Sequence, residues 1–471
     1  MDSENLLSIL FVLDSDPQSG ASLAFFNSFI EQLTDCIAGQ AAVTVFYPEF
    51  SDTEEHYSLS ITQLPKYRRM VTYIPTRLDS FSETYLNEKM DGVFSFILKE
   101  DHFDAIHFWS LKNHSFNYPA IAKERGIPVV CTVFDGFLFS NSIFDKGMSE
   151  SDGNVKISNF VNISIASFVK KIVAAFKPKT RSYWFENIGR YSRYYNRSSI
   201  NGVDSSVFEE RSELSDEIVS FCDKFLFFSE LEYNLFYRPL VPESKAVFME
   251  QGIERELDFW NRPFEIEGAV KFCFMGEILP EDGILELVEA FNILYSEGLH
   301  NELHVYGETH ENAAYFMKLK KRVKNPNVYF HGPVQGGRIN AALNTADVLL
   351  IPSKRFRNDT FLVNNAISER KAVVVSGKNA IAEKIRKSGR GLIIDEVTPR
   401  AIADAVSELE FNRKRLYYFM RVTDDFKAAD MAGNCAFLTS LYGELARNGR
   451  DGDPILLAKR LNRKRKERQR G

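Results

Sequence analysis

Three polar side chains, Asp16, His107 and Asp135, lie at the ends of apolar runs that are typical of buried strands. A carboxylate at such a position can orient a hydroxyl group or act beside a reacting centre. Asp135 is the strongest candidate for that second role. Asp16 has the simpler interpretation of a helix cap, and His107 that of a hydrogen-bonded core histidine.

Basic side chains concentrate in two blocks. Residues 161–200 and residues 459–471 each contain eight Lys or Arg against one Glu, a net charge of +7 apiece. Since the whole chain is at −6, the rest of it carries −20. Such blocks are attracted to phosphate-bearing surfaces, by about 1 kcal/mol per Lys or Arg near an anionic membrane. An anionic membrane surface is therefore a predicted partner, and the alternative for each block is a solvated charged segment.

The composition is that of a globular protein. The 471 residues are 44% hydrophobic and 26% charged, which excludes a wholly disordered or fibrous chain. No apolar run approaches the roughly 18–20 residues of a membrane span. The five cysteines show no pairing or metal-ligand spacing, and the segment MDSENLL is acidic. We expect a cytoplasmic protein, free or peripheral at the inner face of a membrane, with no nucleic-acid partner.

Short apolar runs alternate with helical patterns, which predicts βαβ units and parallel sheets. Strands are predicted at Leu7–Asp14, Ala42–Glu49, Val71–Thr76, Asp104–Ser110, Ile127–Asp135, Lys224–Ser229, Ala246–Ile253, Val270–Gly276, Glu302–Gly307, Asn327–Gly332, Asp347–Ser353, Ala372–Ser376 and Gly391–Asp395. We expect an α/β protein of two Rossmann-like parallel-sheet domains that face a cleft, where a ligand would bind.

The polar stretch 254–268 is the predicted linker between these domains. It separates an amino-terminal domain, 1–253, from a carboxy-terminal domain with closing helices, 269–450, and a basic tail follows at 451–471. The alternation breaks at about 136–207, which we interpret as an insertion in the amino-terminal domain.

The usual short motifs for dinucleotides, P-loop phosphates, zinc proteases and hydrolases do not occur. An ordered series of other segments does: GEILPEDGILELVEAF, LHVYGE, VYFHGPV, LNTADVLLIPS, NNAIS, AVVVS and GRGLIID. In order and spacing this series resembles the carboxy-terminal domain of the family 4 (group 1) retaining glycosyltransferases, which have the GT-B fold. The amino-terminal domain resembles them less closely, through the turn Asp14–Gly20 and the segments DAIHFWS, GIPVVCTVFD and EQGI.

The resemblance implies a glycosyltransferase that moves a sugar, with retention, from a nucleotide-diphosphate sugar to a glycan, lipid-linked or protein acceptor, as in polysaccharide biosynthesis. It implies no metal and no cofactor besides the nucleotide-sugar substrate. On the acceptor side it places Asp16, Gly20 and His107, with Asp135 as the candidate catalytic carboxylate. The candidate donor-binding residues are Gly276, Gly307, Lys354, Arg355, Arg357, Asn364 and Asn365.

The charged positions depart from the family pattern. Glu277 and Asp282 stand where the family has an Arg and a Lys that neutralise the diphosphate. Taken alone, both are most simply interpreted as surface acids. Lys354, Arg355 and Arg357 follow the Pro352–Ser353 turn, and they either restore the lost positive charge or form a solvated turn.

Asn364 and Asn365 align near the family's second glutamate, and they either bind ribose or sugar hydroxyls or form a helix N-cap pair. Two hypotheses follow. In the first, the donor site is rebuilt and the protein is an active transferase. In the second, the site is inactive, and the chain is a GT-B module that serves as a binding or scaffold subunit.

Overall fold

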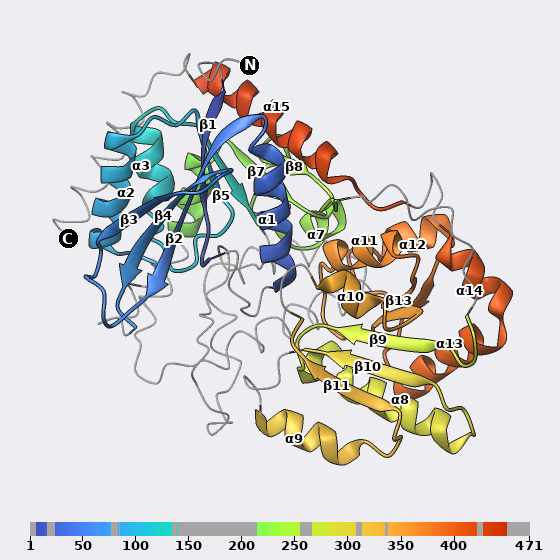
Figure 1. Cartoon of the computed structure of the whole chain (residues 1–471). Helices are drawn as coiled ribbons and strands as arrows, with labels where there is room; N and C mark the ends of the chain where they lie inside the picture. Colours follow the sequence, from blue (N-terminus) through green and yellow to red (C-terminus); the bar gives the residue numbers. More distant parts are fainter. Residues whose placement is uncertain are drawn as a thin grey trace. The chain divides into compact units, whose positions relative to one another are not determined.

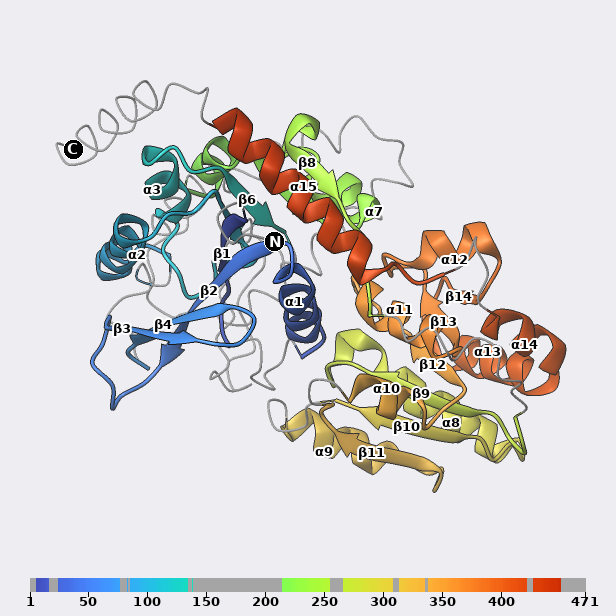
Figure 2. The same cartoon turned by 45° about the horizontal axis from the view of Figure 1, so that its top comes forward.

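The computed structural model describes residues 6–16, 24–76, 83, 85–133, 138, 214–254, 266–307, 313–334, 338–421 and 427–449. These residues form two compact units, coloured along the chain in Figures 1 and 2. Unit 1 combines the described parts of Met1–Pro17, Leu33–Met249 and Cys435–Gly471. Unit 2 combines those of Gln18–Gln32 and Glu250–Asn434.

Unit 1 is built on an eight-stranded sheet in the order β3-β4-β2-β1-β5-β6-β7-β8. Its strands are β1 (Leu7–Val12), β2 (Ala41–Phe50), β3 (Leu59–Gln63), β4 (Arg68–Ile74), β5 (Ala105–Phe108), β6 (Val129–Thr132), β7 (Lys224–Phe227) and β8 (Ala246–Phe248). All neighbouring strands are parallel except β3, which runs antiparallel to β4. The alternation of short apolar runs with helical patterns in the sequence thus predicts the parallel sheet correctly, but β3 was not predicted.

Helices cover both faces of this sheet. The helices of unit 1 include the second half of α1 (Ala24–Ile37), α2 (Glu88–Glu100), α3 (Tyr118–Glu124), the short α7 (Glu230–Glu232) and α15 (Met431–Gly449). One face packs against α2 and α3 through a core that includes Phe46, Phe94 and Phe108. Figures 1 and 2 both show α15 on the other side of the sheet from α2 and α3.

The contacts of His107 explain why α15 belongs to unit 1, although residues up to 450 were expected in the carboxy-terminal domain. His107 is fully buried on β5, and its Nδ1 lies 2.6 Å from the hydroxyl of Tyr442 on α15. Its Nε2 lies 2.7 Å from Thr132 Oγ1 at the end of β6. Burial holds the pKa of His107 well below its ordinary value, so the ring is a neutral bridge between helix and sheet.

His114, in the turn after β5, makes unit 1 sensitive to acid. Its Nε2 lies 2.6 Å from the carbonyl oxygen of Leu13, and burial lowers the pKa of the ring to about 4 despite that bond. The unfolded chain binds a proton at a pKa near 6.5, whereas the folded chain does not, so stability falls as the pH drops from about 6.5 to 4. We expect His114 alone to reduce the free energy of unfolding by about 2 kcal/mol between pH 7 and pH 5.

Urea unfolding at pH 7 and pH 5 checks this expectation with His114→Gln, which retains a side chain able to hydrogen-bond but does not titrate. The variant should lose about 2 kcal/mol less than the wild type between the two pH values. His102→Gln is the matched control, because the His102 side chain is 80% exposed, and it should leave the pH dependence unchanged. A wild-type pH dependence in His114→Gln would contradict the assignment.

Unit 2 is built on a six-stranded, fully parallel sheet in the order β11-β10-β9-β12-β13-β14. Its strands are β9 (Lys271–Met275), β10 (Glu302–Tyr306), β11 (Val328–Gly332), β12 (Val348–Ile351), β13 (Ala372–Ser376) and β14 (Leu392–Ile394). Each lies within a run that the sequence predicts as a strand. The order of these strands along the chain differs from their order in the sheet. The candidate site lies where the two orders diverge.

The helices of unit 2 also lie on both faces of their sheet (Figure 1). They include α8 (Ile284–Ser296), α9 (Ala313–Arg322), α10 (Ile339–Leu343), α11 (Thr360–Ser368), α12 (Ala382–Ser388), α13 (Pro399–Phe411) and α14 (Arg413–Met420). Apolar residues of α8, α13 and α14 form one core with the sheet, including Phe291, Val406 and Leu416. On the other face α11 packs against β13.

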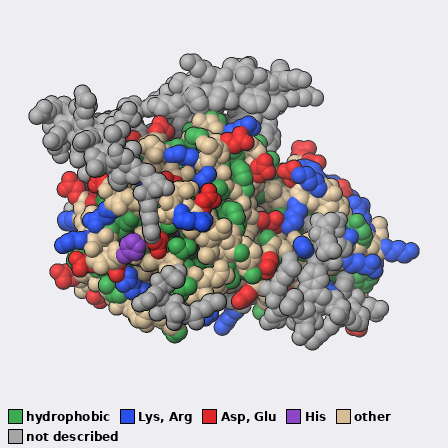
Figure 3. All heavy atoms as spheres, turned by 90° about the horizontal axis from the view of Figure 1, so that it is seen from above, with side chains coloured by type: hydrophobic (Ala, Val, Ile, Leu, Met, Phe, Trp, Pro, Cys, Tyr) green, Lys and Arg blue, Asp and Glu red, His purple; other side chains and the backbone are tan. Residues whose placement is uncertain are grey.

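Most of the expected insertion (139–207) and the whole of the expected tail (451–471) lie outside the described residues, and so do both basic blocks. On the face drawn in Figure 3, acidic and basic side chains of the described residues are interspersed. Among the described helices, none combines the length and the apolar character needed to span a bilayer.

Candidate functional site

The strand order of unit 2 contains a topological switch point. The chain proceeds from β9 through β10 to β11 on one side, and then continues with β12 on the other side of β9. Parallel sheets of this kind bind ligands at the carboxyl ends of the strands where the order reverses. Gly276 and Glu277 follow β9 directly, and Ser353 to Arg357 follow β12 closely, so both segments lie at the switch point.

The loops after β9 and β12 are held tightly together. The backbone nitrogen of Lys354 donates to the carbonyl oxygen of Glu281 over 2.8 Å. Gly283 has φ +73°, and a Cβ added there would lie 2.0 Å from the carbonyl oxygen of Pro352. Glycine therefore suits this position twice over, for its left-handed conformation and for the close approach.

Gly307 is required for a second close approach at the same edge of the sheet. It follows β10, and a Cβ added there would lie 2.3 Å from the carbonyl oxygen of Gly276. The backbone nitrogen of Gly276 donates to Tyr306 across the strands. The two glycines predicted for the donor site are thus neighbours at the carboxyl ends of adjacent strands.

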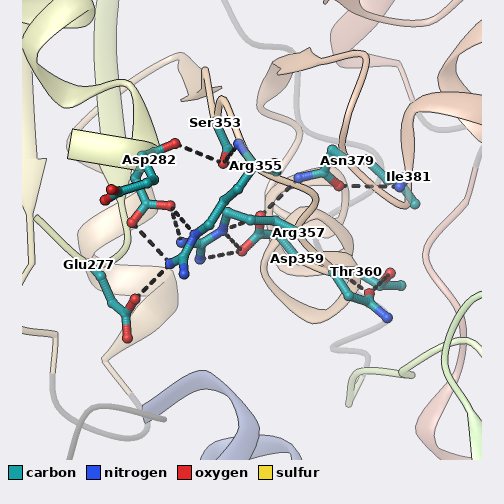
Figure 4. Close-up of polar contacts among 11 residues, drawn as sticks. Glu277, Asp282, Ser353, Arg355, Arg357, Asp359, Thr360, Asn379 and Ile381 are labelled. Atoms are coloured by element: carbon teal, nitrogen blue, oxygen red, sulfur yellow. Dashed lines mark hydrogen bonds and ion pairs between the residues drawn. The ribbon is translucent and has the colours of Figure 1, made fainter. Parts of the chain in front are cut away.

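Five charged side chains at the switch point form one ion-pair network, which we call the arginine cluster: Glu277, Asp282, Arg355, Arg357 and Asp359 (Figure 4). Arg355 donates through Nη2 to Glu277 Oε2 at 2.7 Å, and through Nε to Asp282 Oδ1 at 3.0 Å. Arg357 donates through Nη1 to the same Asp282 oxygen at 2.9 Å.

Asp359 completes the cluster on the side away from Glu277. It accepts from Arg357 Nη2 at 2.7 Å and from Arg357 Nε at 2.9 Å. Asn379, which lies just beyond β13, donates to Asp359 Oδ2 at 2.8 Å. Arg357 is therefore held in place by hydrogen bonds on two sides.

The pKa values of the buried Asp282 and Arg357 depend strongly on the charges beside them. The Asp282 side chain is 1% exposed and that of Arg357 15%. Burial would raise the pKa of Asp282, but Arg355 and Arg357 together hold it below its ordinary value. Burial would lower the pKa of Arg357, and Asp359 and Asp282 raise it above its ordinary value instead. Asp282 and Arg357 are therefore both stabilised in their charged forms.

The structure corrects two sequence interpretations here. Asp282 is a buried partner of two arginines rather than a surface acid, because the short approach of the β9 and β12 loops encloses it. The segment Lys354–Arg357 is likewise no solvated turn, since Arg355 and Arg357 are largely buried in ion pairs. Lys354 lies apart from the cluster and pairs with Glu286, at 2.7 Å between Nζ and Oε1.

Asp359 and Asn379 are members of the site that the sequence analysis missed. The one available signal was the spacing of Arg357 and Asp359, two residues apart after a predicted strand. Nothing in the sequence indicates Asn379, because a turn beyond β13 brings it to Asp359.

The predicted asparagines lie inside α11 rather than at its start. This helix begins at Thr360, so Asn364 and Asn365 fall in its second turn, and the N-cap interpretation is wrong. The amide of Asn364 donates to Glu250 Oε1 at 3.0 Å and to the carbonyl oxygen of Gln251 at 2.8 Å. That of Asn365 donates to the carbonyl oxygen of Phe361. A role for either in ribose or sugar binding stays a prediction.

The acceptor-side residues are only partly described. His107 is the hydrogen-bonded core histidine of unit 1, which was its simpler interpretation. Asp16 lies beyond β1 near Tyr47, whose pKa is raised by burial first and by the charge of Asp16 second. Gly20 and Asp135 lie outside the described residues. Within the described ranges, no three His, Cys, Asp or Glu side chains are grouped so that they could hold a metal ion.

Comparison with known proteins identifies the fold. Residues 269–411 match the family of glycosyl transferases group 1. A sucrose-phosphate synthase from Thermosynechococcus elongatus superposes with a TM-score of 0.62 at 14% identity, over 93% of this chain and 99% of that one. A glycosyltransferase from Rickettsia africae gives 0.57 at 13%, over 94% and 100%.

Anabaena HepE, solved in complex with UDP and glucose, gives a TM-score of 0.54 at 11% identity, over 97% of this chain and 99% of that one. No curated protein matches the sequence. The two parallel-sheet units and these superpositions agree on the architecture. The chain therefore has the GT-B fold, and over residues 269–411 it resembles the group 1 glycosyltransferases.

Proposed function

We propose that the protein is a retaining glycosyltransferase that takes its sugar from a nucleotide-diphosphate sugar. The observation that carries this proposal is the place of Arg355 and Arg357, at the switch point of the unit that matches the family. The acceptor would be a hydroxyl group of a glycan, lipid-linked or protein substrate. The cytoplasmic, membrane-peripheral setting expected from the basic blocks belongs to the same proposal, as does a role in polysaccharide biosynthesis.

The two guanidinium groups at the switch point suit a diphosphate leaving group. Negative charge develops on the diphosphate as its bond to the sugar breaks, and fixed guanidinium groups stabilise that charge. Arg355 is held by Asp282, so its orientation is set before a ligand arrives. Gly276 and Gly307 lie at the neighbouring strand ends, where the lack of a side chain on Gly307 lets the Gly276 carbonyl oxygen approach closely.

In this mechanism the protein supplies orientation and electrostatics. The departing diphosphate can accept the proton of the attacking hydroxyl group, and Asp135 is our proposed carboxylate near the reacting centre. Anabaena HepE in complex with UDP and glucose supports a nucleotide-sugar donor, since it shares the fold.

Arg355→Ala is expected to lower kcat/KM for nucleotide-sugar consumption by about 10- to 100-fold, the effect of losing a charge-assisted hydrogen bond. The release of nucleoside diphosphate measures it. Arg400→Ala is the matched control, because Arg400 is an exposed, ion-paired arginine of the same unit, on α13, and it should retain wild-type activity. Equal activity of both variants would exclude Arg355 from the donor site.

The pairing of the arginines favours a second candidate function. Since both guanidinium groups are already neutralised by carboxylates, the chain would instead be a catalytically inert GT-B module that binds a partner. Incubation of the full chain with UDP-, GDP-, dTDP- and CMP-sugars separates the two. Release of the nucleotide from one donor supports the transferase, and a complete lack of turnover with any acceptor class supports the inert module.

A further inference from the structure

Glu277 differs from the other two carboxylates of the arginine cluster. Its side chain is 33% exposed, whereas those of Asp282 and Asp359 are 1% and 4% exposed. Among the ion pairs of the described residues, Glu277 has one, with Arg355. Asp282 binds both arginines, and Asp359 binds Arg357 through two oxygens. Glu277 is thus the carboxylate of the cluster that is held least tightly.

We propose that Glu277 is an internal counter-ion of Arg355, and that a diphosphate ligand binds by displacing it. The inference rests on the proposed function, because it assigns the diphosphate of that substrate to Arg355. Carboxylate and phosphate oxygens accept the same charge-assisted hydrogen bonds from a guanidinium group. The Glu277 carboxylate, 2.7 Å from Nη2 of Arg355, therefore occupies a position that a phosphate oxygen can take.

The difference in burial decides which carboxylate leaves. Displacement of Asp282 or Asp359 would leave a buried charge without its partner, which is strongly unfavourable. Glu277 is partly in water already, and an exposed ion pair of this kind shifts an equilibrium by at most about fivefold. Arg355 meanwhile stays anchored by Asp282 through Nε and Nη2. Replacement of the Glu277 carboxylate by a phosphate group therefore leaves the other ion pairs of the cluster in place.

The net charge of the cluster also predicts that Glu277 opposes diphosphate binding. With Glu277 the cluster carries one excess negative charge, and a bound diphosphate adds more at the same place. Glu277→Gln removes both the competing group and the like charge while retaining the side-chain length. Diphosphate binding should therefore become tighter in this variant, not weaker.

Calorimetric titration of the full chain with inorganic pyrophosphate and with UDP and GDP tests the proposal. We expect Glu277→Gln to bind pyrophosphate about fivefold more tightly than the wild type. Glu302→Gln is the matched control, since Glu302 is also 33% exposed and paired with a cation, Lys271, but lies on β10 at its amino-terminal end. It should leave the affinity unchanged.

Unchanged or weaker pyrophosphate binding by Glu277→Gln overturns the proposal, and so does a lack of binding by either protein. The proposed function is decided separately, by nucleotide-sugar turnover of the wild type. Turnover without tighter binding in Glu277→Gln would refute the counter-ion alone. Tighter binding without turnover would support the counter-ion and refute the transferase.

Discussion

Asp282→Asn is expected to lower the free energy of unfolding of unit 2 by about 3–5 kcal/mol, the usual result of breaking a buried ion pair from one side. Asp282 accepts from both Arg355 and Arg357 and is almost fully buried. An asparagine keeps the shape but removes the negative charge, and its amide nitrogen faces donors instead of acceptors. Two guanidinium groups would then lose much of their compensation inside the protein. Urea unfolding of the full chain measures the loss.

Glu277→Gln is the matched control for this stability effect. It removes one carboxylate from the same cluster, but Glu277 is partly exposed, so the expected loss is below about 1 kcal/mol. The contribution of the Asp282 carboxylate to the free energy of unfolding should also be lost in acid. Because its pKa is held below the ordinary value, the stabilisation is present above about pH 4 and is lost as the pH falls through the lowered pKa. Equal effects of the two substitutions at neutral pH would show that burial does not determine the strength of these pairs.

Gly283→Ala is expected to destabilise unit 2 by about 2–4 kcal/mol. A left-handed backbone costs a non-glycine residue about 1 kcal/mol, and overpacking of a closed site adds about 1–3 kcal/mol. The added Cβ would lie 2.0 Å from the Pro352 carbonyl oxygen, so the β9 and β12 loops must separate. That separation would also strain the hydrogen bond between Lys354 and Glu281.

Gly298→Ala isolates the part of this effect that comes from the close approach. Gly298 also has a positive φ, +87°, but an added Cβ meets no atom within 4 Å. Its alanine variant should lose only about 1 kcal/mol from backbone strain. If thermal or urea unfolding shows the same loss for both glycines, the tight contact between the two loops is not part of the stable structure.

The parallel strands were predictable because the residues of a fully buried strand form a short apolar run in the sequence. All thirteen predicted runs overlap a strand of one of the two sheets. The strand β3 (Leu59–Gln63) was missed because it is a half-exposed edge strand with polar residues, LSITQ, and among the described strands it pairs with β4 alone. The packing of α15 in unit 1 brings together residues far apart in sequence, such as His107 and Tyr442.

The members of the candidate site were largely predictable, but their relation was not. In the sequence, Glu277 and Asp282 are acids at positions where the family has basic residues. Arg355 and Arg357 are basic residues at other positions. The ion pairs join residues more than 70 positions apart, and they arise because β12 lies beside β9 in the sheet. Spacing alone therefore predicts the charges at the switch point, whereas their mutual neutralisation follows only from the strand order.

The central claim is that the arginine cluster of unit 2 receives the diphosphate of a nucleotide sugar. Calorimetric titration of the full chain with UDP, GDP, dTDP and CMP tests it most directly. We predict that one of the three nucleoside diphosphates binds with 1:1 stoichiometry and that Arg355→Ala removes the heat of binding while Arg400→Ala retains it. The absence of binding for all four at millimolar concentration would contradict the claim.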